Sequence, residues 1–116
     1  MTSDEERTSH DEAGRRGPDT YVLRVSGNMD LDHSDALRSS FLTAVAEAPR
    51  GTEIVFDLQN SSFCDSTGLN VLLAARERAL ESGHGITLAA PSHQMVRLLE
   101  ITGSVELFGF GPAVPT

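Results

Sequence analysis

The sequence predicts an α/β fold in which helices flank a small, mainly parallel sheet, with elements in the order β-α-β-α-β-α-β. Short apolar runs of strand length alternate along the 116 residues with longer segments whose apolar side chains recur at the helical period. Glycine and proline clusters separate these segments. Alternation at these spacings requires crossover connections, and crossover connections join parallel strands.

The first half of the pattern begins with a strand at residues 21–25, Tyr-Val-Leu-Arg-Val. Helical periodicity follows at residues 36–46, and Asp32 is placed to cap the start of that helix. Residues 48–51, Ala-Pro-Arg-Gly, end the helix. Residues 52–58 form the second expected strand, and their near-continuous apolar run predicts burial on both faces of the sheet.

The second half of the pattern repeats this alternation. A helix is expected from about Ser66 to Glu81, because leucines recur there at the helical period, and a Ser-Gly-His-Gly stretch ends it. A strand is then expected at residues 86–90 and a short helix from Pro91 and Ser92 to Ile101. Residues 105–108, Val-Glu-Leu-Phe, are expected to form the last strand.

Segments without a helical or strand pattern bound this alternation at both ends. Residues 1–18 contain only Met1 and Ala13 as apolar side chains, so they predict a flexible polar tail. Residues 109–116 are too rich in glycine and proline for a helix and are expected to form a C-terminal tail. The expected domain therefore covers residues 19–108.

Composition limits the partners. The formal net charge is −8, which disfavours binding to duplex nucleic acid or to an anionic membrane. The nine basic residues other than histidine are all arginine, which excludes chemistry that requires a lysine. A single cysteine, Cys64, and a polar N-terminus without a secretory segment predict a cytoplasmic protein.

The most informative segment is Phe-Cys-Asp-Ser-Thr-Gly-Leu at residues 63–69, between the second expected strand and the next helix. Asp65, Ser66 and Thr67 lie where free backbone N–H groups of a helix start can hold a negative group, and a phosphate on Ser66 is the obvious candidate. The alternative is that Asp65 or Ser66 merely caps the helix. Gly68 in the first turn suggests close approach of another backbone or of a ligand, or tight packing on the sheet.

Enzymatic interpretations fit the sequence poorly. A cysteine phosphatase loop would need arginine six positions after Cys64, and that residue is Asn70. Ser66 is not in a Gly-x-Ser-x-Gly elbow, because position 64 is cysteine. The histidines show no metal-ligand spacing, and no glycine-rich nucleotide motif follows a strand, so no cofactor is expected. Cys64 is expected to be a small buried residue at a strand exit.

Three segments together resemble a known family. They are residues 22–30 (Val-Leu-Arg-Val-Ser-Gly-Asn-Met-Asp), 54–58 (Ile-Val-Phe-Asp-Leu) and 63–69. The chain resembles the STAS domain of bacterial anti-sigma factor antagonists over about residues 20–108, and the resemblance implies a STAS-like fold.

The resemblance implies a binding protein without enzymatic activity of its own. The unphosphorylated antagonist would bind an anti-sigma factor that is also a serine kinase, which frees a sigma factor. The kinase would phosphorylate Ser66, with Thr67 as second choice, and a PP2C-type phosphatase would reverse the reaction. The residues implied in partner binding are Asp30, Asp65, Ser66, Thr67, Gly68 and Asn70.

Two departures from the family pattern and two alternatives remain. Residues 9–17 are polar and unlike the family's usual first strand, and residues 109–116 cannot supply its usual last helix. One alternative function is a STAS subunit of a transporter or of a larger signalling assembly without a phospho-switch. The other is a small hydrolase that uses Ser66 or Cys64, but the sequence places no general base beside either.

Overall fold

The computed structural model describes residues 13–15 and 20–115. The strands are β1 (Ala13–Arg15), β2 (Thr20–Ser26), β3 (Glu53–Asn60), β4 (Ile86–Ala89) and β5 (Gly109–Gly111). The α-helices are α1 (Ser34–Glu47), α2 (Ser66–Glu81) and α3 (His93–Ile101). Two short 3-10 helices, η2 (Leu31–His33) and η3 (Val105–Leu107), complete the elements.

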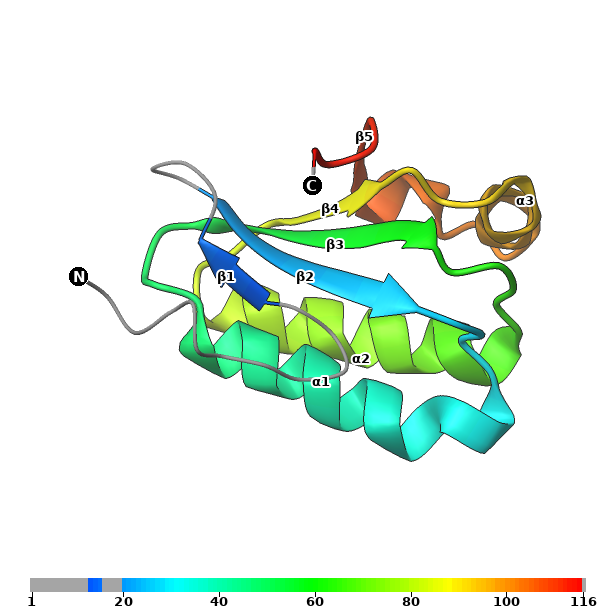
Figure 1. Cartoon of the computed structure of the whole chain (residues 1–116), viewed down its shortest axis with the longest axis horizontal. Coiled ribbons are helices and arrows are strands. Elements are labelled where there is room, and N and C mark those ends of the chain that lie inside the picture. The colour runs from blue at the N-terminus through cyan, green and yellow to red at the C-terminus, as the bar shows by residue number, and fades with distance from the viewer. Residues whose placement is uncertain (1–12, 16–19, 116) are drawn as a thin grey trace.

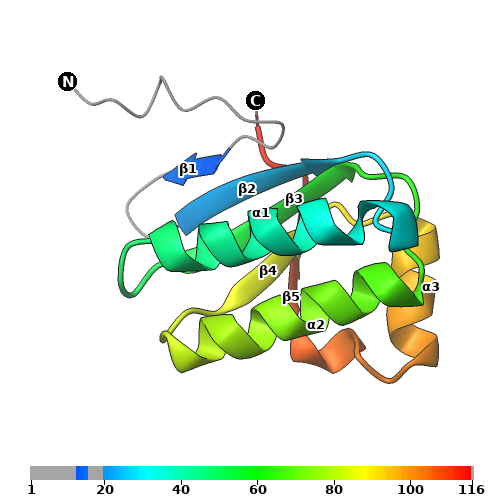
Figure 2. The ribbon, with the colours of Figure 1, turned by 90° about the horizontal axis from the view of Figure 1, so that it is seen from below.

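One sheet with the strand order β1-β2-β3-β4-β5 organises the molecule (Figure 1). The strands β2 to β5 pair in parallel, and β1 pairs antiparallel with β2. The helices α1 and α2 lie side by side on one face of the sheet, and α3 lies near the ends of β3 and β4 (Figure 2). The predicted α/β class and its mainly parallel sheet are confirmed.

The core lies between the sheet and the helices α1 and α2. Alternate residues of β2 and β3 point to this side, and Leu23 and Phe56 among them are buried. Phe41 of α1 stacks on Phe56, with ring centroids 4.5 Å apart. Within the described residues, no helix combines the length and the apolar character needed to cross a membrane.

Three expectations about the elements are wrong. Residues 9–17 were expected to contain no strand, yet Ala13–Arg15 forms β1. Its pairing satisfies backbone groups along β2, which a local hydrophobic pattern cannot reveal. Residues 105–108 form no strand: η3 occupies 105–107, and the last strand, β5, lies in the expected C-terminal tail. The rest of the expected N-terminal tail, residues 1–12 and 16–18, lies outside the described residues.

The third wrong expectation concerns the start of the first helix. Asp30, not Asp32, supplies the cap, and it caps η2, which precedes α1: its side chain accepts a hydrogen bond from the His33 amide. No side chain caps α1 itself. The inserted turn of 3-10 helix carries the chain from the capped position into α1 and explains the displacement by two residues.

Candidate functional site

Two loops meet at the edge where the parallel strands β2 and β3 end. The amide of Met29 donates to the carbonyl oxygen of Phe63 at 2.7 Å, and the amide of Asp65 donates to the carbonyl oxygen of Met29 at 3.0 Å. An isolated parallel bridge between Met29 and Cys64 extends the pairing of the two strands. The loop before α2 is therefore held to the loop before α1 by main-chain bonds.

Asp65 fixes the start of α2. Its Oδ1 accepts a hydrogen bond from the amide of Gly68 at 2.9 Å, which makes Asp65 the N-cap. Its Oδ2 accepts from the amide of Leu31 at 3.3 Å, so the same carboxylate also holds the neighbouring loop. Of the two caps that the sequence leaves open, the structure uses Asp65, and Ser66 is the first residue of the helix.

Gly68 is the point of closest approach between the loops. A Cβ atom at this position would overlap the carbonyl oxygen of Met29 and lie 2.6 Å from its carbonyl carbon. Of the alternatives for Gly68, the close approach of another backbone is therefore the one that the structure bears out. Glycine permits the contact that brings the two loops into register.

Ser66 is exposed at the amino end of α2, whereas Thr67 beside it is half-buried. Within the part of the chain that the structure describes, no hydrogen bond engages the Ser66 hydroxyl or the Thr67 hydroxyl. Asn70, one turn further along α2, is also exposed. The Ser66 hydroxyl is thus accessible, and the backbone that carries it is fixed.

Cys64 is buried, and both its backbone N–H and its backbone carbonyl group are hydrogen-bonded. The side chain of Gln94, on α3, accepts from the Cys64 amide at 2.8 Å and donates to the Cys64 carbonyl at 2.7 Å. Burial, and then the charge of Asp65, raise the pKa of the Cys64 thiol to about 12. The thiol therefore stays protonated at neutral pH and is a poor nucleophile. The expected small buried residue at the strand exit is confirmed.

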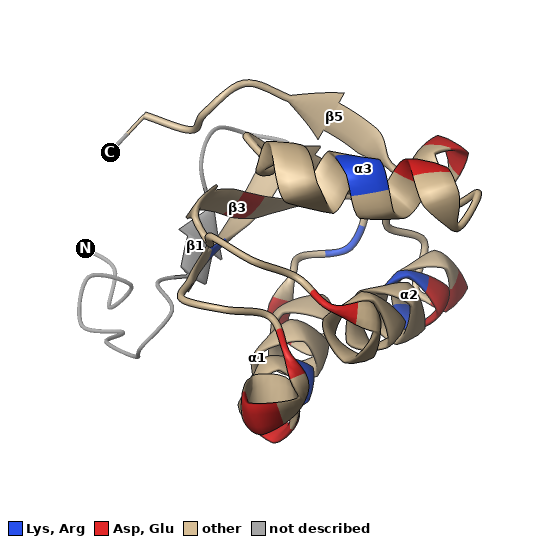
Figure 3. Ribbon diagram, turned by 90° about the vertical axis from the view of Figure 1, so that its right-hand side faces the viewer, with Lys and Arg blue, Asp and Glu red and all other residues tan. Residues whose placement is uncertain are grey.

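Asp30 organises the other loop. Its carboxylate accepts from the His33 amide at 3.2 Å and lies 2.5 Å from the His33 ring nitrogen Nδ1. The hydrogen bond with His33 lowers the pKa of Asp30, and the same bond raises the pKa of His33. Figure 3 shows acidic positions at the starts of α1 and α2, and Asp32 and Asp35 among them are exposed.

Two exposed apolar side chains lie in the paired loops. Leu31 is 67% exposed and Phe63 is 45% exposed. Leu31 is bonded through its amide to Asp65, the residue before Ser66, and Phe63 is bonded through its carbonyl oxygen to Met29. The sequence interpretation overlooked both. Apolar residues directly beside the polar motif, outside any helical or strand period, were the available signal.

The expected site residues thus lie at one edge of the sheet. The structure brings Asp30, Asp65, Ser66, Thr67 and Gly68 together through the paired loops, and Asn70 follows on the exposed side of α2. We call the exposed surface formed by Leu31, Phe63, Ser66 and Asn70 the Ser66 surface.

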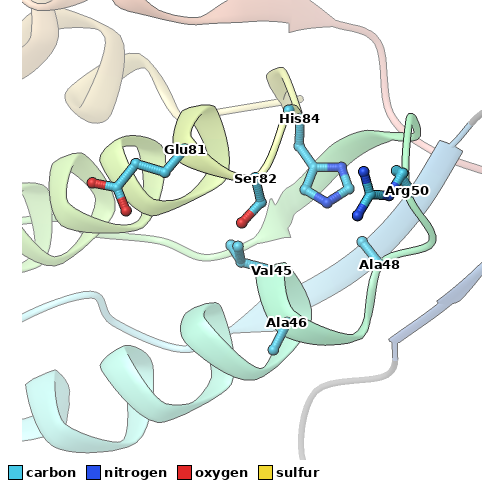
Figure 4. A pocket seen from close by; sticks show the side chains of 8 residues that line it. Val45, Ala46, Ala48, Arg50, Glu81, Ser82 and His84 are labelled. Atoms are coloured by element: carbon cyan, nitrogen blue, oxygen red, sulfur yellow. The ribbon is translucent and has the colours of Figure 1, made fainter.

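A separate pocket of about 560 Å³ lies at the opposite ends of α1 and α2. His84 lines it and its Nδ1 lies 2.8 Å from the carbonyl oxygen of Thr52, while Glu81 extends away from the His84 ring (Figure 4). Arg50 and Ser82 are also in its lining. Nowhere in residues 13–15 and 20–115 do three or more histidine, cysteine, aspartate or glutamate side chains group as a metal site.

Comparisons with known proteins identify the family of the chain. A family model described as "Mlab, STAS domain" matches residues 13–108. An anti-sigma F factor antagonist from Lysinibacillus sphaericus is 31% identical over 86 residues, which cover 73% of this chain and 72% of that protein. The crystal structure of an anti-sigma factor antagonist from Mycobacterium paratuberculosis superposes with a TM-score of 0.72 at 27% identity and covers 90% of this chain and 86% of that one.

The fold is shared more widely. A sulfate transporter family protein from Wolinella succinogenes superposes with a TM-score of 0.67 at 18% identity, over 82% of this chain and 78% of that one. At that identity the likeness concerns the fold alone. Because the family model covers residues 13–108, the chain belongs to the STAS domain family, and it is similar to the family's anti-sigma factor antagonists.

Proposed function

We propose that the protein is an anti-sigma factor antagonist whose Ser66 surface binds an anti-sigma factor serine kinase in the cytoplasm. In this proposal the unphosphorylated chain binds the kinase, and a sigma factor is released. Phosphorylation of Ser66 ends the complex, and a PP2C-type phosphatase restores the binding form. The chain is a binding partner and a substrate, and it performs no catalysis itself.

The observation that carries the proposal is the exposed Ser66 hydroxyl on a backbone that is fixed by Asp65 and Gly68. A kinase must reach the hydroxyl, and a partner must meet a defined surface. Exposure of Ser66 satisfies the first condition. The bonds that join the loops at Met29 and Asp65 satisfy the second.

The chemistry of the switch follows from the surroundings of Ser66. The kinase would transfer the γ-phosphoryl group of ATP to Ser66 Oγ: the new O–P bond forms, the bond to ADP breaks, and the kinase accepts the hydroxyl proton. The product carries a charge of about −1.5 to −2 at neutral pH. Leu31 and Phe63 offer that charge no partner, and Asp65 repels it.

This charge is sufficient to release a partner. In the complex a docked partner would cover the phosphate, and burying a poorly paired charge costs several kcal/mol. Since about 1.4 kcal/mol corresponds to a tenfold change in affinity, one phosphate can weaken binding by roughly a hundredfold or more. The helix start tolerates the charge, so the fold need not change.

The direct test combines the protein with its cognate kinase and ATP. We expect mass spectrometry to find one phosphate, on Ser66, in the wild type and in Thr67→Ala, and none in Ser66→Ala. Ser66→Ala should bind the kinase as the wild type does, and Ser66→Glu should bind at least tenfold more weakly. Phosphate on another residue, or full binding by Ser66→Glu, would contradict the switch.

A STAS subunit without a phospho-switch is the second candidate, because the sulfate transporter family protein shares the fold of this chain. In that case a pull-down from the source cells with wild type and Ser66→Glu would recover the same partner with both. Recovery of a kinase by the wild type alone would instead support the antagonist. The pull-down therefore discriminates between the two functions and identifies the partner.

A further inference from the structure

The face of the sheet opposite α1 and α2 carries a segment without regular secondary structure, residues 112–115, which we call the C-terminal strap. Figure 1 shows it turning back after β5 on that side of the sheet. In the described part of the chain no helix covers this face. The strap therefore lies where the sheet would otherwise be open to solvent.

An apolar groove separates the strap from the sheet. Its floor is formed by side chains of the three central strands, Val22, Val55 and Ala89, and the strap forms its other wall. A pocket of about 270 Å³ remains between them. The strap covers the floor without filling the groove.

A three-residue polar cluster holds the strap by its main chain. Arg24 Nη2 donates to the carbonyl oxygen of Pro115 at 2.8 Å, and Gln59 Nε2 donates to that of Val114 at 3.4 Å. Both side chains are also bonded to Asp57, at 3.0 Å and 3.2 Å. Asp57 is only 1% exposed, so its carboxylate is a fixed support that orients two donors toward the groove.

The strap is nevertheless weakly attached. Pro112 and Pro115 have no N–H group and cannot extend the hydrogen-bond ladder of the sheet. Pro112, Ala113 and Pro115 are exposed, and Val114 is half-buried. Displacing the strap would therefore cost little buried surface and few hydrogen bonds.

We propose that this face is a binding groove for an extended apolar peptide, and that the C-terminal strap is its resident occupant. The side chains of Arg24 and Gln59 donate hydrogen bonds to main-chain carbonyl oxygens of the occupant, and an aliphatic side chain of the occupant, here Val114, lines the groove. Another segment of this kind gains access only by displacing the strap. The inference concerns the face opposite the helices and stands independently of the role proposed for Ser66.

The test uses the full chain and a fluorescent peptide with the sequence of residues 111–116. In the wild type the tethered strap competes at an effective concentration on the order of millimolar, so the peptide should bind poorly. Val114→Asp places a charge over an apolar floor and should free the groove, so that the peptide binds about tenfold or more tightly than to wild type. Thr43→Asp, an exposed position on α1, is the control with the same added charge.

Three outcomes decide the inference. Gln59→Ala added to Val114→Asp should weaken peptide binding again, because the peptide then loses one donor to its main chain. A peptide with aspartate in place of its valine should not bind. Equal affinity for folded Val114→Asp and wild type, whether weak or tight, would overturn the proposal. If Val114→Asp does not fold, Val114→Ser serves for the same comparison.

Discussion

At Gly68 the first turn of α2 passes so close to the main chain of Met29 that no side chain fits between them. Gly68→Ala must push the two loops apart, because the obstacle is backbone and not a flexible side chain. We expect a loss of roughly 2–3 kcal/mol in the free energy of unfolding, which is the usual cost of overpacking. Chemical denaturation measures this loss.

Gly85→Ala is the matched control. A Cβ at Gly85 would lie 2.5 Å from Oε1 of Glu53, the far end of a side chain that can move. Its cost should stay under about 1 kcal/mol. Equal losses at Gly68 and Gly85 would show that the loop contact is more compliant than the structure indicates.

Cys64 carries the clearest pH dependence at the scale of one residue. Its pKa of about 12 lies above the ordinary value of 9.0, so the folded chain keeps the thiol proton where an unfolded chain releases it. The resulting stability is fully present below pH 9 and is lost as the pH rises toward 12. Wild type should therefore lose more stability between pH 8 and pH 10 than Cys64→Ala does.

Reaction with a disulfide reagent tests the same state of Cys64. The native thiol should remain unmodified at pH 8 for as long as the chain stays folded, and denaturant should release it. Rapid modification of the native protein would contradict both the burial and the raised pKa.

The residues of the motif itself could be predicted, whereas those around it could not. Asp65, Ser66 and Gly68 carry local signals, because helix starts have strong preferences at these positions. Gln94 lies 30 residues from Cys64 in the chain, and nothing in a single sequence indicates that its side-chain amide binds both backbone polar groups of Cys64. Leu31 and Phe63 were missed because apolar side chains are expected in the core, and only the fold shows which of them remain exposed at the surface.

At the scale of elements, the N-cap of α2 does more than start a helix. Asp65→Ala should remove the bonds from the amides of both Gly68 and Leu31. We expect a loss of about 2 kcal/mol in the free energy of unfolding and weaker partner binding. Ser92→Ala, which removes the single N-cap bond to the amide of Met95 on α3, should cost about 1 kcal/mol and leave binding unchanged.

A comparison of the same two variants can contradict this role of Asp65. If Asp65→Ala and Ser92→Ala lose equal stability and bind the partner equally well, the second bond of Asp65 has no role in holding the two loops together. Asp65→Asn should lie between the two, because its amide can still accept at one oxygen.

Elements with a helical period or an apolar run could be predicted, including the four-residue strand β4, whereas the three-residue strands could not. The helix expected from about Ser66 to Glu81 has those bounds in the structure, because capping residues mark its start and the Ser-Gly-His-Gly stretch marks its end. The strands β1 and β5 have three residues each and no periodic pattern. Their existence depends on pairing with β2 and β4, which is a tertiary interaction.

At the scale of the whole molecule, the mainly parallel sheet could be predicted from the alternation of strands and helices. The sequence could not show what covers the second face of the sheet, because the C-terminal strap has no secondary structure of its own. It is held by side chains of β2 and β3, which are remote in sequence. Long-range contacts of this kind leave no local pattern.

The structure predicts that a charge at Ser66 affects only its immediate surroundings and not the fold. Ser66 is exposed and outside the core, and its neighbours are fixed by Asp65, Gly68 and Met29. In Ser66→Glu the helix start favours the charge by about 0.3–1 kcal/mol, and repulsion from Asp65 opposes it. The free energy of unfolding should therefore stay within about 0.5 kcal/mol of that of the neutral, equally large Ser66→Gln.

Amide chemical shifts should differ between Ser66→Glu and Ser66→Gln at residues 29–33 and 63–70, and nowhere in β4 or β5. Shift differences spread over those distant elements would mean that the charge changes the fold, and that a partner is released by a conformational change. The other result is that differences are confined to the two loops and that only Ser66→Glu loses partner binding. Charge at the Ser66 surface would then itself be the switch, because the rest of the fold is the same in both variants.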